Sequence, residues 1–372
     1  MHTPLVARCL RGLETLVATE IVGSGPAAVT ELRHREVHFT AAGPLPPQLR
    51  TADDVFLLAA RRPDIGTTRR ALRELVELAE LAEPTEPVGL SEHTGIDISA
   101  SFLGSRTFTR YDAEDAVGQA LAHRLSVPYH SRRTGIAPPP GSRGWRLTLD
   151  GTYATLLLRT EDRPLHRRAY KRHALPGTLH PPLAAAMAVL ADIRPGATVL
   201  DPCCGAGTLL IEAALAHPDA HFRAHFRGFD LSPDAITAAS ANADDLPIAI
   251  HRADAGRLPL PSASIDRVLC NPPWGTQVSA GGLLAEGPSR WWTELRRVLA
   301  PTGTAVLLLA DRDAVTAALE HDFTPVLVQR LRLSGAQPFL VHLMRDDRVR
   351  GKADRKERVL PGPGPGRPAR TP

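Results

Sequence analysis

From residue 182 to residue 344 the sequence alternates between helical and strand-like segments. Strands that alternate with helices at this spacing form a mostly parallel sheet that is covered on both faces. The last two strands follow one another directly, which favours an antiparallel pair. We expect helices at 182–192, 207–216, 233–243, 289–299 and 312–321, and strands at 198–201, 226–230, 248–253, 265–270, 304–310, 325–333 and 338–344.

A glycine turn, DPCCGAGT over residues 201–208, follows the first of these strands. Gly205 and Gly207 allow the backbone to approach a ligand closely, and ligands of open α/β sheets bind beyond the carboxyl ends of the strands. A dinucleotide-binding turn would have a third glycine at position 210, which is Leu, and a phosphate-binding loop would have Gly-Lys-Ser/Thr. Asp201 would repel a pyrophosphate, so the turn suits a ligand with an ammonium or hydroxyl groups.

Three successive strands end in a carboxylate: Asp201, Asp230 and Asp254. The second can accept hydrogen bonds from both hydroxyls of a ribose, and the third from the amino group of an adenine. Aspartate is common at strand ends and helix caps, so each of these aspartates alone is weak evidence for a ligand site. An ammonium, a ribose and an adenine together describe S-adenosylmethionine, and we expect this cofactor.

The fourth strand ends at Asn-Pro-Pro-Trp, residues 271–274. Two prolines cannot continue a strand, so the chain leaves it with a restricted backbone. The side-chain oxygen of Asn271 and the carbonyl of Pro272 can each accept an N–H bond from an exocyclic base amine, which localises its lone pair. Because the prolines restrict the backbone, little conformational ordering remains to occur at Pro273 when the substrate binds. Trp274 can stack on an extruded base. The motif predicts methyl transfer to such an amine.

Several substrates fit this motif. Guanine N2 and adenine N6 are both exocyclic amines, and a glutamine side chain of a protein offers an amide nitrogen. A further functional class is a non-catalytic RNA-binding protein with a relict methyltransferase fold. The presence of the three acids and Asn271 argues against it.

The motifs DPCCGAGTLLIEAA, FDLSPDAI and LCNPPWG together resemble the amino-methylating class I methyltransferases. The stretch LHRRAYKRHALPGTLHPPLAAAMA is similar to the junction of THUMP-domain RNA methyltransferases, and CLRGLETLVATEI resembles the ferredoxin-like unit before that domain. The resemblance implies a Rossmann-like, seven-stranded, mostly parallel sheet. It also implies methylation of guanine N2 in tRNA, with the acceptor stem at position 6 as target, or in 23S rRNA.

The resemblance also implies site residues and domain limits. It assigns the methionine part, the ribose and the adenine to Asp201, Cys203, Gly205, Ala206, Gly207, Thr208, Asp230, Leu231, Asp254, Ala255, Asn271, His180 and Pro181. Its target site is Asn271, Pro272, Pro273 and Trp274, although the family more often has Tyr or Phe at position 274 and the stretch after Gly275 matches no pattern of it. The domains are a ferredoxin-like unit at 1–65, a THUMP domain at 66–172, a methyltransferase domain at 173–345 and a disordered Pro/Gly tail at 346–372.

Before residue 173 the local patterns are weaker. We expect helices after Gly12, at 67–83 and from an Asp112 cap to Leu125, with a hairpin of 145–149 and 153–159. Other expected strands are at 36–39, 55–60 and 96–101, and residues 132–144 are expected to form a loop.

The net charge is +4, with a basic excess over residues 101–180 and in the tail. A polyanion partner fits this distribution, and RNA is the expected one. The candidate phosphate contacts are Arg132, Arg133, Arg167, Arg168, Lys171 and Arg172.

The four cysteines fit neither a zinc site nor a disulfide framework, so we expect no metal and a reducing cytoplasm. No apolar run approaches the ~20 residues that span a bilayer. The N-terminal stretch has no secretory apolar core. We expect a monomer that does not bind a membrane.

Overall fold

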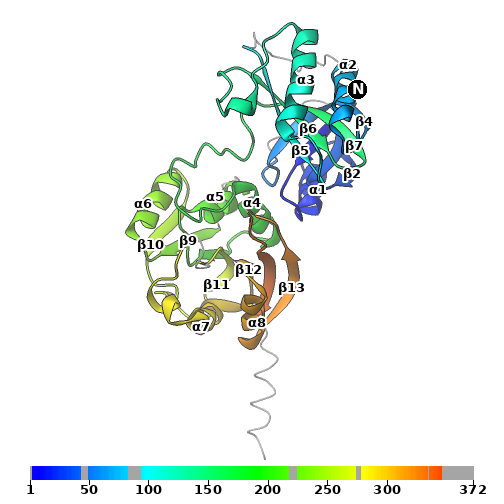
Figure 1. The fold of residues 1–372 in the computed structure, drawn as a ribbon. Coiled ribbons are helices and arrows are strands. Elements are labelled where there is room, and N and C mark those ends of the chain that lie inside the picture. The colour runs from blue at the N-terminus through cyan, green and yellow to red at the C-terminus, as the bar shows by residue number, and fades with distance from the viewer. Residues whose placement is uncertain are drawn as a thin grey trace, which may run out of the picture.

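The computed structural model describes residues 2–42, 49–82, 94–217, 224–273, 278–333 and 335–345. These residues form two mixed α/β bodies, each built on a seven-stranded sheet (Figure 1). The expected tail at 346–372 and Trp274 lie outside the described residues. No helix among the described residues is long and apolar enough to cross a membrane.

The C-terminal sheet confirms the expected class. Its strands run in the order β10-β9-β8-β11-β12-β14-β13. The first five are parallel, and β14 lies antiparallel between β12 and β13. Their bounds are β8 Thr198–Asp201, β9 His225–Asp230, β10 Ile248–Arg252, β11 Ile265–Cys270, β12 Leu299–Leu309, β13 Phe323–Arg330 and β14 Phe339–Arg345.

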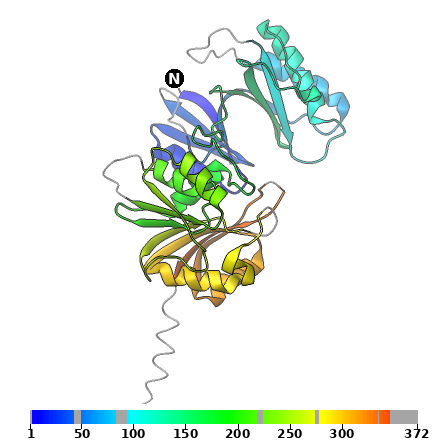
Figure 2. The ribbon, with the colours of Figure 1, turned by 90° about the vertical axis from the view of Figure 1, so that its left-hand side faces the viewer.

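Helices cover both faces of this sheet (Figure 2). One face carries α4 (Pro181–Leu190), α5 (Thr208–Leu215) and α6 (Pro233–Asn242), and the other carries α7 (Pro288–Val298) and α8 (Arg312–Glu320). Alternate strand residues enter the two cores, so Val199 packs on the first side and Leu200 on the second. Because successive strand side chains point to opposite faces, the parts of the strands that are buried on both sides are apolar, as at residues 268–270 of β11.

The chain order places a crevice at β8. From β8 the chain proceeds outward to β9 and β10, and then returns to place β11 on the other side of β8. Connections on the two sides of β8 therefore diverge at its carboxyl end, which is where open α/β sheets bind ligands.

The N-terminal body also has one continuous sheet, in the order β2-β3-β1-β4-β7-β6-β5. Strand β4 pairs with β7, so the segments on either side of residue 65 share this sheet. Its elements are β1 His2–Arg8, α1 Glu14–Gly23, β2 Ala27–Arg33, β3 Glu36–Ala42, β4 Asp54–Pro63, α2 Glu74–Leu81, β5 Ile96–Phe102, α3 Arg110–Leu125, β6 Arg143–Leu149 and β7 Tyr153–Arg159.

Two local expectations in this body need correction. Helix α2 is shorter than expected and follows a 3₁₀ helix at Arg69–Arg73. Helix α3 is capped by Thr109, whose hydroxyl accepts from the backbone N–H of Asp112, while Asp112 accepts from the N–H of Thr109. The cap is thus a reciprocal capping box, in which Asp112 is the second partner.

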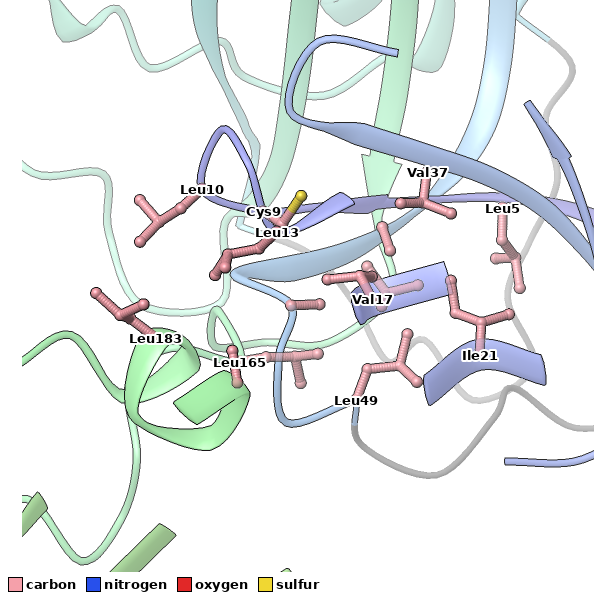
Figure 3. Packing of buried hydrophobic residues seen from close by; sticks show 14 of the residues in the cluster. Leu5, Cys9, Leu10, Leu13, Val17, Ile21, Val37, Leu49, Leu165 and Leu183 are labelled. Carbon is pink, nitrogen blue, oxygen red and sulfur yellow. The ribbon is translucent and has the colours of Figure 1, made fainter. Parts of the chain in front are cut away.

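The two bodies share a hydrophobic core. One cluster of buried side chains includes Leu13, which precedes α1, Val17 of α1, Leu165 of the connecting segment and Leu183 of α4 (Figure 3). Leu183 points toward Leu10 of the N-terminal body in this view. Burial of apolar surface from both sides stabilises the contact between the bodies.

Candidate active site

A cavity of ≈ 810 Å³ opens at the carboxyl ends of the parallel strands. This volume suits a ligand of the size of a nucleoside cofactor. The described residues that line it come from the turn after β8, the residues at the ends of β9, β10 and β11, the start of α6, Lys171, the segment 175–180, the segment 278–284 and the β13–β14 connection.

The two glycines of the turn have different functions. Gly205 lines the cavity at a φ of 52°, and a Cβ there would meet no atom within 4 Å. Gly207 precedes α5 at a φ of 82° and does not line the cavity, and its Cβ would lie 3.3 Å from the Cβ of Ala239 on α6. The first glycine opens the backbone toward a ligand, and the second allows two helices to pack closely.

Asp201 is fully buried at the end of β8, and one of its oxygens accepts from the backbone N–H of Cys203 at 3.1 Å. Burial raises the pKa of Asp201 to about 8, and the nearby carboxylate of Asp230 adds to the rise. Hydrogen bonds from Cys203 and from the Cys270 thiol act in the opposite direction. A cationic ligand group would favour the charged form of Asp201.

Asp230 ends β9 and is fixed by two backbone donors. Its two oxygens accept from the N–H of Gly205 and of Ser232, each at 2.9 Å. A carboxylate has about four acceptor positions, so each oxygen retains one for a hydroxyl. Leu231 and Thr208 also line the cavity near this carboxylate.

Asp254 is held by a segment that the sequence did not predict to be near it. Its oxygens accept from the N–H of Gly256 at 2.8 Å and of Leu283 at 2.9 Å. A Cβ on Gly282 would lie 2.1 Å from the Asp254 carboxylate, so glycine is required where this segment crosses the cavity wall. With Ala255, the wall includes Val278, Ser279, Gly281 and Leu284.

Asn271 lies at the carboxyl end of β11 and lines the cavity, as do Pro272 and Pro273. The Nδ2 of Asn271 donates to the carbonyl of Gly177 at 3.4 Å. This contact leaves Oδ1 as the acceptor of the side chain, and no described residue donates to it. The structure therefore brings the amide and the three acids to one cavity.

The remaining predicted cofactor residues divide between the cavity wall and the core. Cys203, Ala206 and His180 line the cavity. The Nε2 of His180 lies 2.7 Å from a carboxylate oxygen of Asp53 in the N-terminal body. Pro181 is the buried first residue of α4 and does not line the cavity.

Arg168 is not available for RNA, contrary to the sequence-based hypothesis. Its side chain is only 7% exposed, and its Nε donates to the fully buried Glu212 of α5 at 2.9 Å. Its other nitrogens donate to the carbonyls of Leu165 and Arg50. Glu212 also accepts from Arg50 and from the Tyr170 hydroxyl, so Arg168 belongs to a buried joint between the two bodies.

The other candidate phosphate contacts lie at the surface or in the cavity. Three candidates have exposed guanidinium groups that form ion pairs: Arg132 with the buried Asp97, Arg133 with Asp112 and Asp115, and Arg172 with the exposed Asp244. Arg167 is exposed, and no described side chain pairs with its guanidinium. Lys171 lines the cavity.

The part of the chain that the structure describes contains no group of three or more His, Cys, Asp and Glu that could hold a metal ion. The four cysteines are free, and Cys270 is buried behind the cavity.

Sequence reasoning missed three parts of the site: the segment 175–179, the segment 278–284, and Leu333 and Ala336 of the β13–β14 connection. The Pro/Gly-rich stretch around Gly177 was a signal for the first. The others reach the cavity through long-range packing that no local pattern shows.

Comparisons with known proteins agree with this architecture. Residues 168–335 match the family model described as RMKL-like, methyltransferase domain. A tRNA (guanine(6)-N2)-methyltransferase of Thermus thermophilus is 36% identical over 57% of this chain and 61% of its own length. A U6 snRNA (guanine-N(2))-methyltransferase of Bos taurus is 36% identical over 52% of this chain and 39% of its own length. The matched part of the chain thus spans less than two thirds of these curated relatives.

The crystal structure of TrmN from Thermus thermophilus superposes with a TM-score of 0.74 at 28% identity, and the match covers 92% of this chain and 100% of that chain. The superposition includes the N-terminal body as well as the catalytic sheet. Residues 168–335 of this chain are therefore similar to the RMKL-like methyltransferase domain, and the C-terminal sheet has the class I methyltransferase fold.

Proposed function

We propose that this protein transfers a methyl group from S-adenosylmethionine to the exocyclic N2 amine of a guanosine in tRNA, in the acceptor stem at position 6. One observation carries the proposal: the Asn271-Pro272-Pro273 turn lines the same cavity as Asp201, Asp230 and Asp254. The family match of residues 168–335 supports the reaction class.

The cavity residues fit this cofactor. Asp201 is a buried carboxylate that suits an ammonium group, and the fixed oxygens of Asp230 suit ribose hydroxyls. Asp254, Ala255 and Leu231 form the adenine end with the segment 278–284. When bound, the cofactor supplies an electrophilic methyl group on its sulfonium.

The chain itself orients the nucleophile. The Oδ1 of Asn271 and the carbonyl of Pro272 accept the two N–H bonds of the base amine, which directs its lone pair away from the ring. The amide of Asn271 is oriented by the carbonyl of Gly177, and the two prolines restrict the backbone. No strong base is needed, because a methylated aromatic amine is acidic enough to lose its proton to water.

The relatives favour guanine N2 over adenine N6, since both curated names specify that atom in an RNA. We choose tRNA as the target because the Thermus thermophilus relative matches a larger share of this chain than the Bos taurus relative does. Residues 1–65 and 66–172 are proposed as the ferredoxin-like unit and the THUMP domain that hold the RNA. We also propose a monomer that acts in the cytoplasm without a metal.

The test is methyl transfer from labelled S-adenosylmethionine to unmodified tRNA, 23S rRNA and U6 snRNA, followed by nucleoside mass spectrometry. We expect N2-methylguanosine in tRNA, at the same rate with and without EDTA. Label in another RNA, or on adenosine, would support the proposed methyl transfer but identify a different substrate. Failure to label any RNA would contradict the proposal and lead first to protein glutamine as substrate.

A further inference from the structure

The cavity carries an uneven set of charges. Four of its lining residues are carboxylates: Asp201, Asp230, Asp234 and Asp254. Among the described lining residues, a single side chain, that of Lys171, has a formal positive charge. A ligand with groups of both signs would match this set.

The backbone around Lys171 is fixed beside the glycine turn. The N–H groups of Arg172 and His173 donate to the Oδ1 of the buried Asn242, at 3.0 Å and 2.9 Å. The Nδ2 of Asn242 donates in turn to the carbonyls of His173 and Ala206. On the other flank, Tyr170 donates its hydroxyl to Glu212 of α5. Lys171 is therefore held between α5 and α6, at the glycine-turn end of the cavity.

The ammonium of Lys171 has no counterion in the part of the chain that the structure describes. The residue is half-buried, and burial lowers its pKa with no offset from a neighbouring carboxylate. A partly desolvated cation without an anionic partner costs free energy, which a bound anion would offset.

The methionine part of the proposed cofactor supplies such an anion. It is an α-amino acid, so its ammonium and its carboxylate are attached to one carbon. The buried Asp201 suits the ammonium, and the neighbouring carboxylate then lies in a cavity whose lining includes four acids. A cation that faces the carboxylate would offset the repulsion from these acids.

We propose that Lys171 binds the α-carboxylate of the cofactor's methionine part. The proposal rests on the proposed function and removes Lys171 from the residues that contact RNA phosphate. It makes Asp201 and Lys171 the two ends of a site that recognises a zwitterionic amino acid.

The test measures binding of two thioethers to the full-length protein by calorimetry. One is S-adenosylhomocysteine, and the other is its decarboxylated analogue, which keeps the amine and lacks the carboxylate. Both are titrated into the wild type, Lys171→Met, Lys171→Arg and the control Arg172→Met, whose native side chain is exposed and paired with Asp244. Circular dichroism verifies that the variants are folded.

We expect Lys171→Met to weaken binding of S-adenosylhomocysteine roughly tenfold to a hundredfold, the range of a charge-assisted hydrogen bond. Its affinity for the decarboxylated analogue should equal that of the wild type. Lys171→Arg should restore part of the loss, and Arg172→Met should change neither affinity.

Two results would overturn the proposal. Equal losses for both thioethers would mean that Lys171 does not recognise the carboxylate. Unchanged thioether affinities with a raised KM for RNA would assign Lys171 to a phosphate. A wild type that binds neither thioether would contradict the proposed function itself, whereas tight wild-type binding that Lys171→Met leaves intact would contradict only the assignment of Lys171.

Discussion

The two polar atoms of the Asn271 side chain have different partners. Its Nδ2 donates to the carbonyl of Gly177, and in the proposed mechanism its Oδ1 accepts from the base amine. We predict that Asn271→Ala lowers kcat by roughly 10²–10³-fold, the usual loss on removal of one preorganised polar group. Its affinity for S-adenosylhomocysteine should remain close to that of the wild type. Single-turnover methylation and calorimetry measure the two quantities, and normal turnover by this variant would exclude the proposed mechanism.

Asp201 should make stability depend on pH. Its folded pKa of about 8 lies above the ordinary value, so between about pH 4 and pH 8 the folded protein holds a proton that the unfolded chain has already released. The stability from this proton is fully present below about pH 4 and is lost as the pH rises to about 8. We therefore predict that the ligand-free wild type loses stability relative to Asp201→Asn from pH 5 to pH 9. Urea unfolding of both proteins tests this, and a difference that is constant with pH would refute it.

At the residue scale the sequence predicted that three acids and Asn271 lie together, and the structure places them around one cavity, but the sequence did not predict their hydrogen-bond partners. Asp201, Asp230, Asp254 and Asn271 were recognised because acids after successive strands and an Asn-Pro-Pro turn have a definite chemistry. The sequence could not show that Leu283 donates to Asp254, because that contact spans 29 residues and depends on the path of the segment after Trp274.

Two glycines with the same backbone conformation allow a test at the scale of the turn. Gly207 and Gly196 have φ values of 82° and 80°, but a Cβ meets Ala239 only at Gly207. Alanine at either position costs about 1–2 kcal/mol from the left-handed backbone. At Gly207 we predict an additional loss of about 1 kcal/mol or more, because α6 must move away from α5. Chemical unfolding of Gly207→Ala and Gly196→Ala gives the difference, and equal losses would contradict the argument.

At the element scale the C-terminal alternation of helices and strands was predicted well, because short apolar runs such as residues 268–270 alternate with segments of helical periodicity. Strands β1 and β2 were not predicted. Edge strand β2 alternates exposed and half-buried residues and contains few large apolar side chains. Strand β1 includes Pro4, which favours neither a helix nor a central strand.

The joint between the bodies should respond to mutation differently from the exposed basic surface. Arg168→Met would leave the fully buried Glu212 with fewer donors, and we predict a loss of roughly 3 kcal/mol in unfolding free energy. Arg172→Met removes an exposed pair with Asp244 and should cost less than about 1 kcal/mol. Urea unfolding distinguishes the two, and equal small losses would mean that the joint does not stabilise the molecule.

Arg167 provides the complementary test with RNA, because its guanidinium is exposed and unpaired among the described residues. We predict that Arg167→Gln leaves the unfolding free energy unchanged and reduces the salt slope of RNA binding by about 1, the value for one phosphate contact. Filter binding at several salt concentrations measures the slope. An unchanged slope would remove Arg167 from the RNA surface.

The continuous N-terminal sheet has a consequence for how a target is chosen. Strands β4 and β7 fuse its two halves, and Glu212 with its three donors attaches the connecting segment to the catalytic body. These contacts would keep a constant distance between Asn271 and an RNA end that is bound by the N-terminal body. Under the proposed function this span would set the target: an acceptor stem lengthened by one base pair should be methylated one nucleotide away from position 6.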